Sequence, residues 1–338
     1  MTRLSGLALQ LVVPCALVAV VGLGAGNASP ENQIYWLNAL TSVAIVVALY
    51  TFVGNSGVLS FGHISFVAIG AFTAGLLTVP LEQKQGALPD VYPLLRDHTV
   101  GGVTSLILAA AAGGVFAFVV GLPLMRLSGL AAGIATFAVL EITHNLLSNW
   151  TSIGPGLGTL TGVPETTGPW QATIGAVIAI AVAFGYQRSR LGRLLRATRE
   201  DAAAARGIGV NVHRQRLWAF TLSGALAGFA GGLYVHFLGF INAGDVYLDL
   251  TFLTLAMLVV GGMTSLWGAV VGALAVSGLD SFLSKAEDGI KVIGVTIDVP
   301  QGTRLIFLGA IMALVLIVRP SGITGGREFS LAWLQRKR

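Results

Sequence analysis

Several ionisable side chains fall inside long apolar runs of this 338-residue sequence, among them Glu141, His144, His63 and Asp280. Glu141 and His144 are three residues apart, so a helix would place them on one face. An ionisable group in hydrocarbon is costly unless it faces water or a partner, which makes these residues candidates for a polar pathway or for ion coupling. The alternative is that Glu141 hydrogen-bonds His144 or a neighbouring helix and serves packing alone.

Sequence motifs for catalysis, nucleotide binding and metal binding are absent. There is no GxxxxGK[ST] phosphate-binding loop, no HExxH and no CxxC. The five histidines lack zinc-ligand spacing, and Cys15 is the single cysteine. We therefore expect no catalytic residue, no metal site and no cofactor in this chain, which would not be an enzyme.

The composition identifies a membrane protein. Hydrophobic residues make up 54% of the chain and charged residues only 10%, whereas soluble domains carry about 25% charged residues. These values exclude an ordinary cytosolic enzyme. The net charge of +5 is explained by basic loops beside a membrane, so we expect lipid contact and no nucleic-acid partner.

Ten apolar runs are long enough to be candidate spans, since a crossing helix needs roughly 20 apolar residues, although the shortest runs would be broken or re-entrant. We predict an all-α polytopic membrane protein of about ten transmembrane or partly re-entrant helices, forming one domain over residues 1–338. The runs are 7–23, 34–53, 58–79, 101–122, 131–147, 172–184, 217–241, 250–262, 269–282 and 305–318.

The basic residues give the orientation of these spans. Placing the polar segment 187–216 in the cytoplasm puts fifteen of the twenty Lys and Arg on the same side, including those of a basic tail at 319–338. The positive-inside rule favours this arrangement, with both termini cytoplasmic. The run 7–23 also resembles a secretory signal peptide. We expect it to be a retained anchor helix; cleavage would leave nine spans.

Glycine patterns predict close contacts and helix breaks. Gly224, Gly228 and Gly232 form a small-residue stripe, which favours helix packing within the bundle, or alternatively a subunit interface. Segments 57–62 and 262–268 echo each other, and paired breaks often mark a transport pathway. Chance similarity is the competing explanation, because glycine is abundant. The pathway interpretation assigns lining roles to Ser60, Gly62, His63, Glu141, His144 and Ser265.

The segment 186–210 is the one long basic stretch. Within it, Asp201-Ala-Ala-Ala-Ala-Arg-Gly207 predicts a short helix and turn against which another protein can dock. Small alanines permit close approach, Asp201 lies where a negative charge favours a helix start, and Gly207 allows the turn that ends the helix. A loop that merely sets topology would explain the arginines but not the alanine block.

Several of these stretches together resemble a known family. The chain is similar, over most of its length, to the LivM-type permease subunit of bacterial branched-chain amino acid ABC transporters. The stretches that carry the resemblance are 57–71, 122–129, 196–210 with 217–232, and 259–273.

The resemblance implies an importer with two cytoplasmic ABC ATPase subunits, a homologous second permease subunit and an extracytoplasmic substrate-binding protein in the bacterial inner membrane. ATP and Mg would be bound by the ATPases. The family's acidic-Ala-Ala-x-x-x-Gly loop docks on the ATPase, and here an aspartate, Asp201, replaces its usual glutamate. Coupling roles then fall on Arg199, Glu200, Asp201, Ala202, Ala203, Arg206 and Gly207.

The expected function is ATP-driven uptake of a branched-chain amino acid. A urea or short-chain amide permease of the same family is one alternative, because the binding protein largely sets selectivity. An ion-coupled secondary transporter or channel is the alternative from another class, with Glu141 and Asp280 as coupling groups. That alternative predicts transport without ATPase partners.

Overall fold

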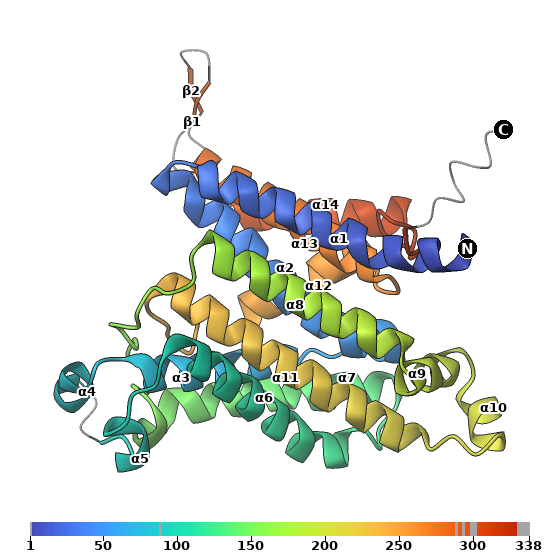
Figure 1. The fold of residues 1–338 in the computed structure, drawn as a ribbon, viewed down its shortest axis with the longest axis horizontal. Coiled ribbons are helices and arrows are strands. Elements are labelled where there is room, and N and C mark those ends of the chain that lie inside the picture. The colour runs from blue at the N-terminus through green and yellow to red at the C-terminus, as the bar shows by residue number, and fades with distance from the viewer. Residues whose placement is uncertain (1, 88–89, 288–289, 293–294, 298–302, 330–338) are drawn as a thin grey trace.

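The computed structural model, drawn in Figure 1, describes residues 2–87, 90–287, 290–292, 295–297 and 303–329. Helices dominate this part of the chain. The two strands form one antiparallel hairpin between α13 and α14. The elements are α1 Thr2–Asn27, α2 Pro30–Ser56, α3 His63–Thr78, α4 Leu81–Ala87, α5 Pro93–Arg96, α6 Gly102–Leu124, α7 Gly129–Asn149, the 3-10 turn η1 Thr151–Ile153, α8 Pro169–Arg188, α9 Arg190–Glu200, α10 Ala202–Gly207, α11 Val212–Leu238, α12 Leu248–Gly261, α13 Leu266–Glu287, β1 Ile290–Val292, β2 Val295–Ile297 and α14 Thr303–Val318.

Each of the ten predicted spans corresponds to a helix, which confirms the polytopic all-α fold. Among the described residues, seven helices are long and apolar enough to cross a membrane. The three shorter apolar helices are α3, α12 and α14. Short predicted runs match α12 and α14, whereas the short runs 172–184 and 269–282 belong to the full-length helices α8 and α13. Helix α2 lies at the centre, since 94% of its most apolar window is buried inside the protein.

The connections between helices gather at two ends of the bundle (Figure 1). We call one of them the α9–α10 end. There, two hydrogen bonds join segments that are distant in the sequence: Arg216 donates to Leu127 O over 3.1 Å, and Thr324 N donates to Gly261 O. At the opposite end, Leu160 N donates to Ile241 O over 2.8 Å. The loops therefore alternate between ends as the sequence predicts. The last part of the predicted basic tail, 330–338, lies outside the described residues.

Glycines allow α11 to pack against α6 at backbone distance. A methyl group added to Gly228 would lie 2.3 Å from the carbonyl oxygen of Ala109, and one on Gly224 would lie 2.2 Å from the β-carbon of Ala117. At Gly232 the nearest atom is the end of the flexible Leu106 side chain, at 2.8 Å. The predicted stripe thus faces a neighbouring helix of the same chain, as small-residue packing in membranes requires.

We expect Gly228→Ala to destabilise the bundle by about 3 kcal/mol, because the new methyl group meets rigid backbone and α11 must move away from α6. Unfolding in increasing SDS measures this loss. Gly278→Ala is the matched control on α13, since nothing lies within 4 Å of its added methyl group. Equal stability of the two variants would contradict the α6–α11 contact.

Candidate functional site

Side-chain caps define the two short helices of the polar segment. Ser189 accepts a hydrogen bond from Gly192 N at 3.2 Å and begins α9. Asp201 ends α9 and begins α10, where its Oδ1 accepts from Ala203 N at 2.8 Å and Ala204 N at 2.9 Å. These backbone donors, Ala204 first and then Ala203, hold the pKa of the Asp201 carboxyl below its ordinary value. The carboxylate is therefore the form that fixes α10.

The glycine that turns the chain after α10 is not the predicted one. Gly207 is the last helical residue, whereas Gly209 has a positive φ of 83°. Only glycine adopts this left-handed region without strain, so Gly209 makes the turn. At Gly207 an added methyl group would meet nothing within 4 Å. The prediction that Gly207 makes this turn is therefore wrong: Gly207 is an exposed residue of α10, and the turn is at Gly209.

Helix α10 presents a small and mostly exposed surface. Ala203, Arg206 and Gly207 are exposed, and only Ala205 is buried in this helix. Ile208 follows with 78% of its side chain exposed. A large exposed apolar residue beside a flat alanine surface is suited to a protein contact. Sequence analysis missed Ile208; its signal was an aliphatic residue directly after the Ala-Arg-Gly run.

Arg199 points back into the bundle. Its Nη1 donates to Gly54 O over 2.8 Å, and its aliphatic stem packs where Gly57 ends α2 in a left-handed conformation. The last carbonyls of a helix lack intrahelical donors and attract cations, so Arg199 caps α2. Glu200 pairs with Arg199 at 2.7 Å but is itself 72% exposed.

The base of α8 adds a second link between the polar segment and α2. Gln187 is buried and its Oε1 accepts from the Tyr50 hydroxyl on α2 at 2.8 Å. The backbone oxygen of Gln187 accepts from Arg196 on α9. Helix α9 is therefore tied to α8 through Arg196 and to the end of α2 through Arg199.

The two glycine-rich segments that echo each other are both helix breaks at the α9–α10 end. Gly57 (φ 71°) separates α2 from α3, and Gly262 (φ 118°) separates α12 from α13. They also adjoin each other, since a methyl group on Gly54 would lie 2.7 Å from the Met263 carbonyl oxygen. The break beside Gly54 is the one that Arg199 caps.

His63 lies in a packed, hydrogen-bonded core. Its Nε2 is 2.5 Å from Ser223 Oγ, and Nδ1 is 3.2 Å from Ser60 Oγ. Because the Ser223 hydroxyl donates to Ala48 O, its oxygen must accept from Nε2–H, and Nδ1 then accepts from Ser60. Phe52, Phe66 and Phe220 surround the ring. His63 and Ser60 are thus fully engaged in packing.

Gly62 and Ser265 also lie at close contacts. A methyl group on Gly62 would lie 2.1 Å from Thr136 O on α7. Ser265 is buried and its Oγ accepts from Gly268 N at 3.0 Å at the start of α13. Sequence analysis missed Glu328, whose carboxylate accepts from Leu266 N at 2.9 Å and caps the same helix. Its capping role links the segment after α14 to the α12–α13 break.

Glu141 and His144 share one cluster on the predicted helix face. The Tyr247 hydroxyl donates to the Glu141 carboxylate, and the Tyr247 ring stacks on His144 with centroids 3.9 Å apart. Asn145 Nδ2 donates to Glu141 Oε1 at 2.9 Å. The two side chains do not bond each other, but are bridged by Tyr247 from the segment before α12. Both are only partly buried.

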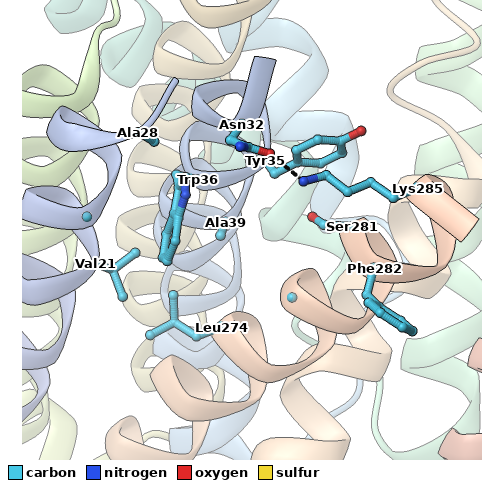
Figure 2. Close-up of a pocket in the computed structure, with 12 residues that line it drawn as sticks. Val21, Ala28, Asn32, Tyr35, Trp36, Ala39, Leu274, Ser281, Phe282 and Lys285 are labelled. Atoms are coloured by element: carbon cyan, nitrogen blue, oxygen red, sulfur yellow. Dashed lines mark hydrogen bonds between the residues drawn. The ribbon is translucent and has the colours of Figure 1, made fainter. Parts of the chain in front are cut away.

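A cavity of about 580 Å³ lies at the end of the bundle opposite α9 and α10, between α1, α2 and α13 (Figure 2). Val21, Trp36 and Leu274 line its apolar part. Lys285 bonds Asn32 and lies 4.5 Å from the centre of the Tyr35 ring. The cation is therefore already satisfied by these two neighbours. Asp280, on the same helix, is buried.

Comparison with known proteins places most of the bundle, without α1, in one group. Residues 32–316 match the family described as "Branched-chain amino acid transport system / permease component". This range runs from the start of α2 into α14. No solved structure matches the chain significantly.

Individual relatives extend over most of the chain. The "High-affinity branched-chain amino acid transport system permease protein LivM" of Escherichia coli (strain K12) is 28% identical and covers 93% of this chain and 73% of its own length. Its Salmonella typhimurium counterpart is 26% identical with the same coverage. The "Autoinducer 2 import system permease protein LsrC" of Salmonella typhi is 26% identical over 73% of this chain and 74% of its own length.

Proposed function

This chain belongs to the family of permease components of branched-chain amino acid transport systems, and from that premise we propose that it is the membrane permease of an ATP-driven importer for leucine, isoleucine or valine. It is a multi-pass membrane protein that works with other subunits. The relatives named LivM support the substrate class. Because a relative named for autoinducer 2 import has the same fold family, substrate choice is a separate question from the mechanism.

The observation that carries the proposal is the surface of α10. It exposes Ala203, Gly207 and Ile208 on a helix whose start is fixed by Asp201. A short capped helix with small side chains and one aliphatic anchor is suited to a groove on a partner protein. We assign docking of the ATPase to this surface. Arg206 and Ala202 flank it, and Glu200 exposes its carboxylate beside it.

Arg199 would then transmit the movement of the ATPase to the bundle. Docked α10 moves α9, which is held to α2 through the bond between Arg199 and Gly54 O. Gly54 also adjoins Met263, which lies in the break between α12 and α13. A shift at the end of α2 would therefore move both helix breaks. Interrupted helices at corresponding positions are where transporters change access. This sequence of contacts would let ATP hydrolysis open and close a path.

Further subunits complete the importer that we propose. Two ATPases would bind ATP and Mg, a homologous permease would form the other half of the membrane path, and an extracytoplasmic protein would deliver substrate. The membrane is the bacterial inner membrane, with the α9–α10 end and both termini in the cytoplasm, as the basic residues favour. We propose Glu141 and His144 as pathway residues, because their cluster with Tyr247 remains partly exposed.

Reconstitution tests this function directly. Proteoliposomes holding the chain with its ATPases and second permease, supplied with the binding protein, should accumulate radiolabelled leucine only with ATP. Urea and acetamide supplied as competitors should leave leucine uptake unchanged. Uptake of urea instead of leucine would show that the chain is a urea or short-chain amide permease. Uptake by the chain without ATPases, driven by an ion gradient, would refute the ATP-driven importer and favour a secondary transporter.

A further inference from the structure

A second cavity lies at the α9–α10 end, where α6 ends and α11 begins. Its volume is about 330 Å³. It adjoins the α10 surface, because Arg206 of α10 is among its lining residues. The lining residues are Met125, Arg126, Ser128, Arg206, Val210, Asn211, Val212, His213 and Arg216.

The lining of this cavity carries positive charge without a counter-charge. Arg126, Arg206 and Arg216 supply three guanidinium groups, and no acidic residue lines the cavity. Within the described part of the chain, the ion pairs are those of Arg96 with Asp97 and Arg199 with Glu200. Guanidinium groups that converge without a carboxylate are suited to a phosphate group, which their forked donors bind in pairs.

One guanidinium nitrogen and one imidazole nitrogen beside this cavity lack hydrogen-bond partners among the described residues. Nε of Arg216 and Nδ1 of His213 are inaccessible to water, and neither bonds any residue that the structure describes. The Arg216 guanidinium is held in place by the bond from its Nη1 to Leu127 O at 3.1 Å. A buried polar group without a partner costs stability. Because both nitrogens are closed even to water, an anion in the cavity would reach the guanidinium groups only through their other nitrogens.

An exposed apolar strip continues from the cavity along the bundle. Phe118 and Leu122 of α6 and Trp218 of α11 have 37%, 42% and 44% of their side chains exposed. Phe118 and Trp218 adjoin each other, with ring centroids 6.5 Å apart. This strip lies on spans that cross the membrane, beside a tryptophan of the kind that marks a headgroup interface.

We propose that this cavity binds the phosphate headgroup of an anionic phospholipid whose acyl chains lie on the Phe118–Trp218 strip. The three guanidinium groups that line the cavity recognise the phosphate, and the strip distinguishes a lipid from a soluble phosphate compound. Basic pockets between spans on the cytoplasmic side commonly have this use. Only the assignment to the cytoplasmic leaflet rests on the proposed function. Lipid binding itself is measured on the chain alone, so failure of either proposal leaves the other standing.

Native mass spectrometry of the delipidated full chain tests the site. Added phosphatidylglycerol should be retained as one tight copy per chain, and phosphatidylcholine should not. Arg126→Gln should weaken phosphatidylglycerol about fivefold, since one basic residue beside an anionic headgroup contributes about 1 kcal/mol. Arg126→Lys keeps the charge but loses the paired donors, so it should bind more tightly than Arg126→Gln and less tightly than wild type. Arg193→Gln is the matched control, because Arg193 is exposed on α9 and does not line the cavity.

Three results would overturn the proposal. These are equal retention of phosphatidylglycerol by Arg126→Gln and wild type, equal retention of phosphatidylcholine and phosphatidylglycerol by wild type, and binding of glycerol 3-phosphate as tight as that of the lipid. The last would identify a soluble phosphate site. If Arg126→Gln does not fold, the comparison of the three probes on wild type and on Arg126→Lys decides the question.

Discussion

Replacing Gly207 with phenylalanine will reduce uptake by the reconstituted importer at least tenfold while the membrane bundle stays folded. The space around Gly207 is open in this chain, since an added methyl group meets nothing within 4 Å. The new ring therefore projects into whatever docks on α10. Overpacking at a close-packed contact costs about 1–3 kcal/mol, and each 1.4 kcal/mol is tenfold in affinity. Co-purification of the ATPase with the variant measures the loss of docking.

Two controls separate this effect from damage to the fold. Gly207→Ala adds only a methyl group and should keep most of the uptake. Gly185→Phe places the same ring at another exposed glycine with open space, on α8 outside the α10 surface, and should bind ATPase normally. Full uptake and normal ATPase binding by Gly207→Phe would show that the ATPase does not dock on α10.

Arg199→Met will uncouple ATP hydrolysis from uptake without releasing the ATPase. The substitution keeps an apolar stem against Gly57 but removes the charge-assisted bond to Gly54 O. Such a bond contributes about 1.5–3 kcal/mol, so α9 and α2 should move independently. We expect transport to fall about tenfold or more, with ATPase binding unchanged. Uptake and ATP hydrolysis measured on the same proteoliposomes give the number of substrate molecules taken up per ATP hydrolysed, which should fall.

The comparison with Arg193→Met isolates the contact with α2. Arg193 lies on the same helix and is exposed, so its loss removes an equal charge without touching Gly54. Arg199→Lys retains a cation and should recover part of the coupling. If Arg199→Met instead loses the ATPase from the complex, Arg199 contacts the ATPase directly and the transmission route through α2 is wrong.

Much of the fold was predictable because membrane helices are specified locally. A run such as 34–53 is apolar enough to identify α2 by itself, since hydrogen bonds within a helix join residues four apart and lipid requires every backbone group to be paired. The helix caps at Asp201 and the break at Gly57 are also local. What local information could not decide was which glycine ends α10, because Gly207 and Gly209 are equally permissive in the unfolded chain.

The candidate site was only partly predictable. The sequence predicted a docking surface from the alanines and Asp201 and assigned Arg199 a coupling role; what it could not predict is that the Arg199 side chain bonds the end of α2. The sequence predicts His63 and Ser60 as pathway residues; in the structure they lie within hydrogen-bonding distance of each other, and Ser223 and three phenylalanines contact the His63 ring. A polar residue in an apolar run does not reveal by itself whether its partner is water or another helix.

The sequence by itself determined the membrane helices, their alternation between two ends and the capped helix in the basic segment, because these depend on hydropathy, capping and charge over a few neighbouring residues. Only the tertiary structure decided the contacts between distant segments. Arg199 and Gly54 are 145 residues apart, and Glu328 reaches Leu266 across 62. Such pairs depend on how closely the helices pack. Glycines such as Gly228 determine the distance between two helices, because they let the backbone of the neighbouring helix approach.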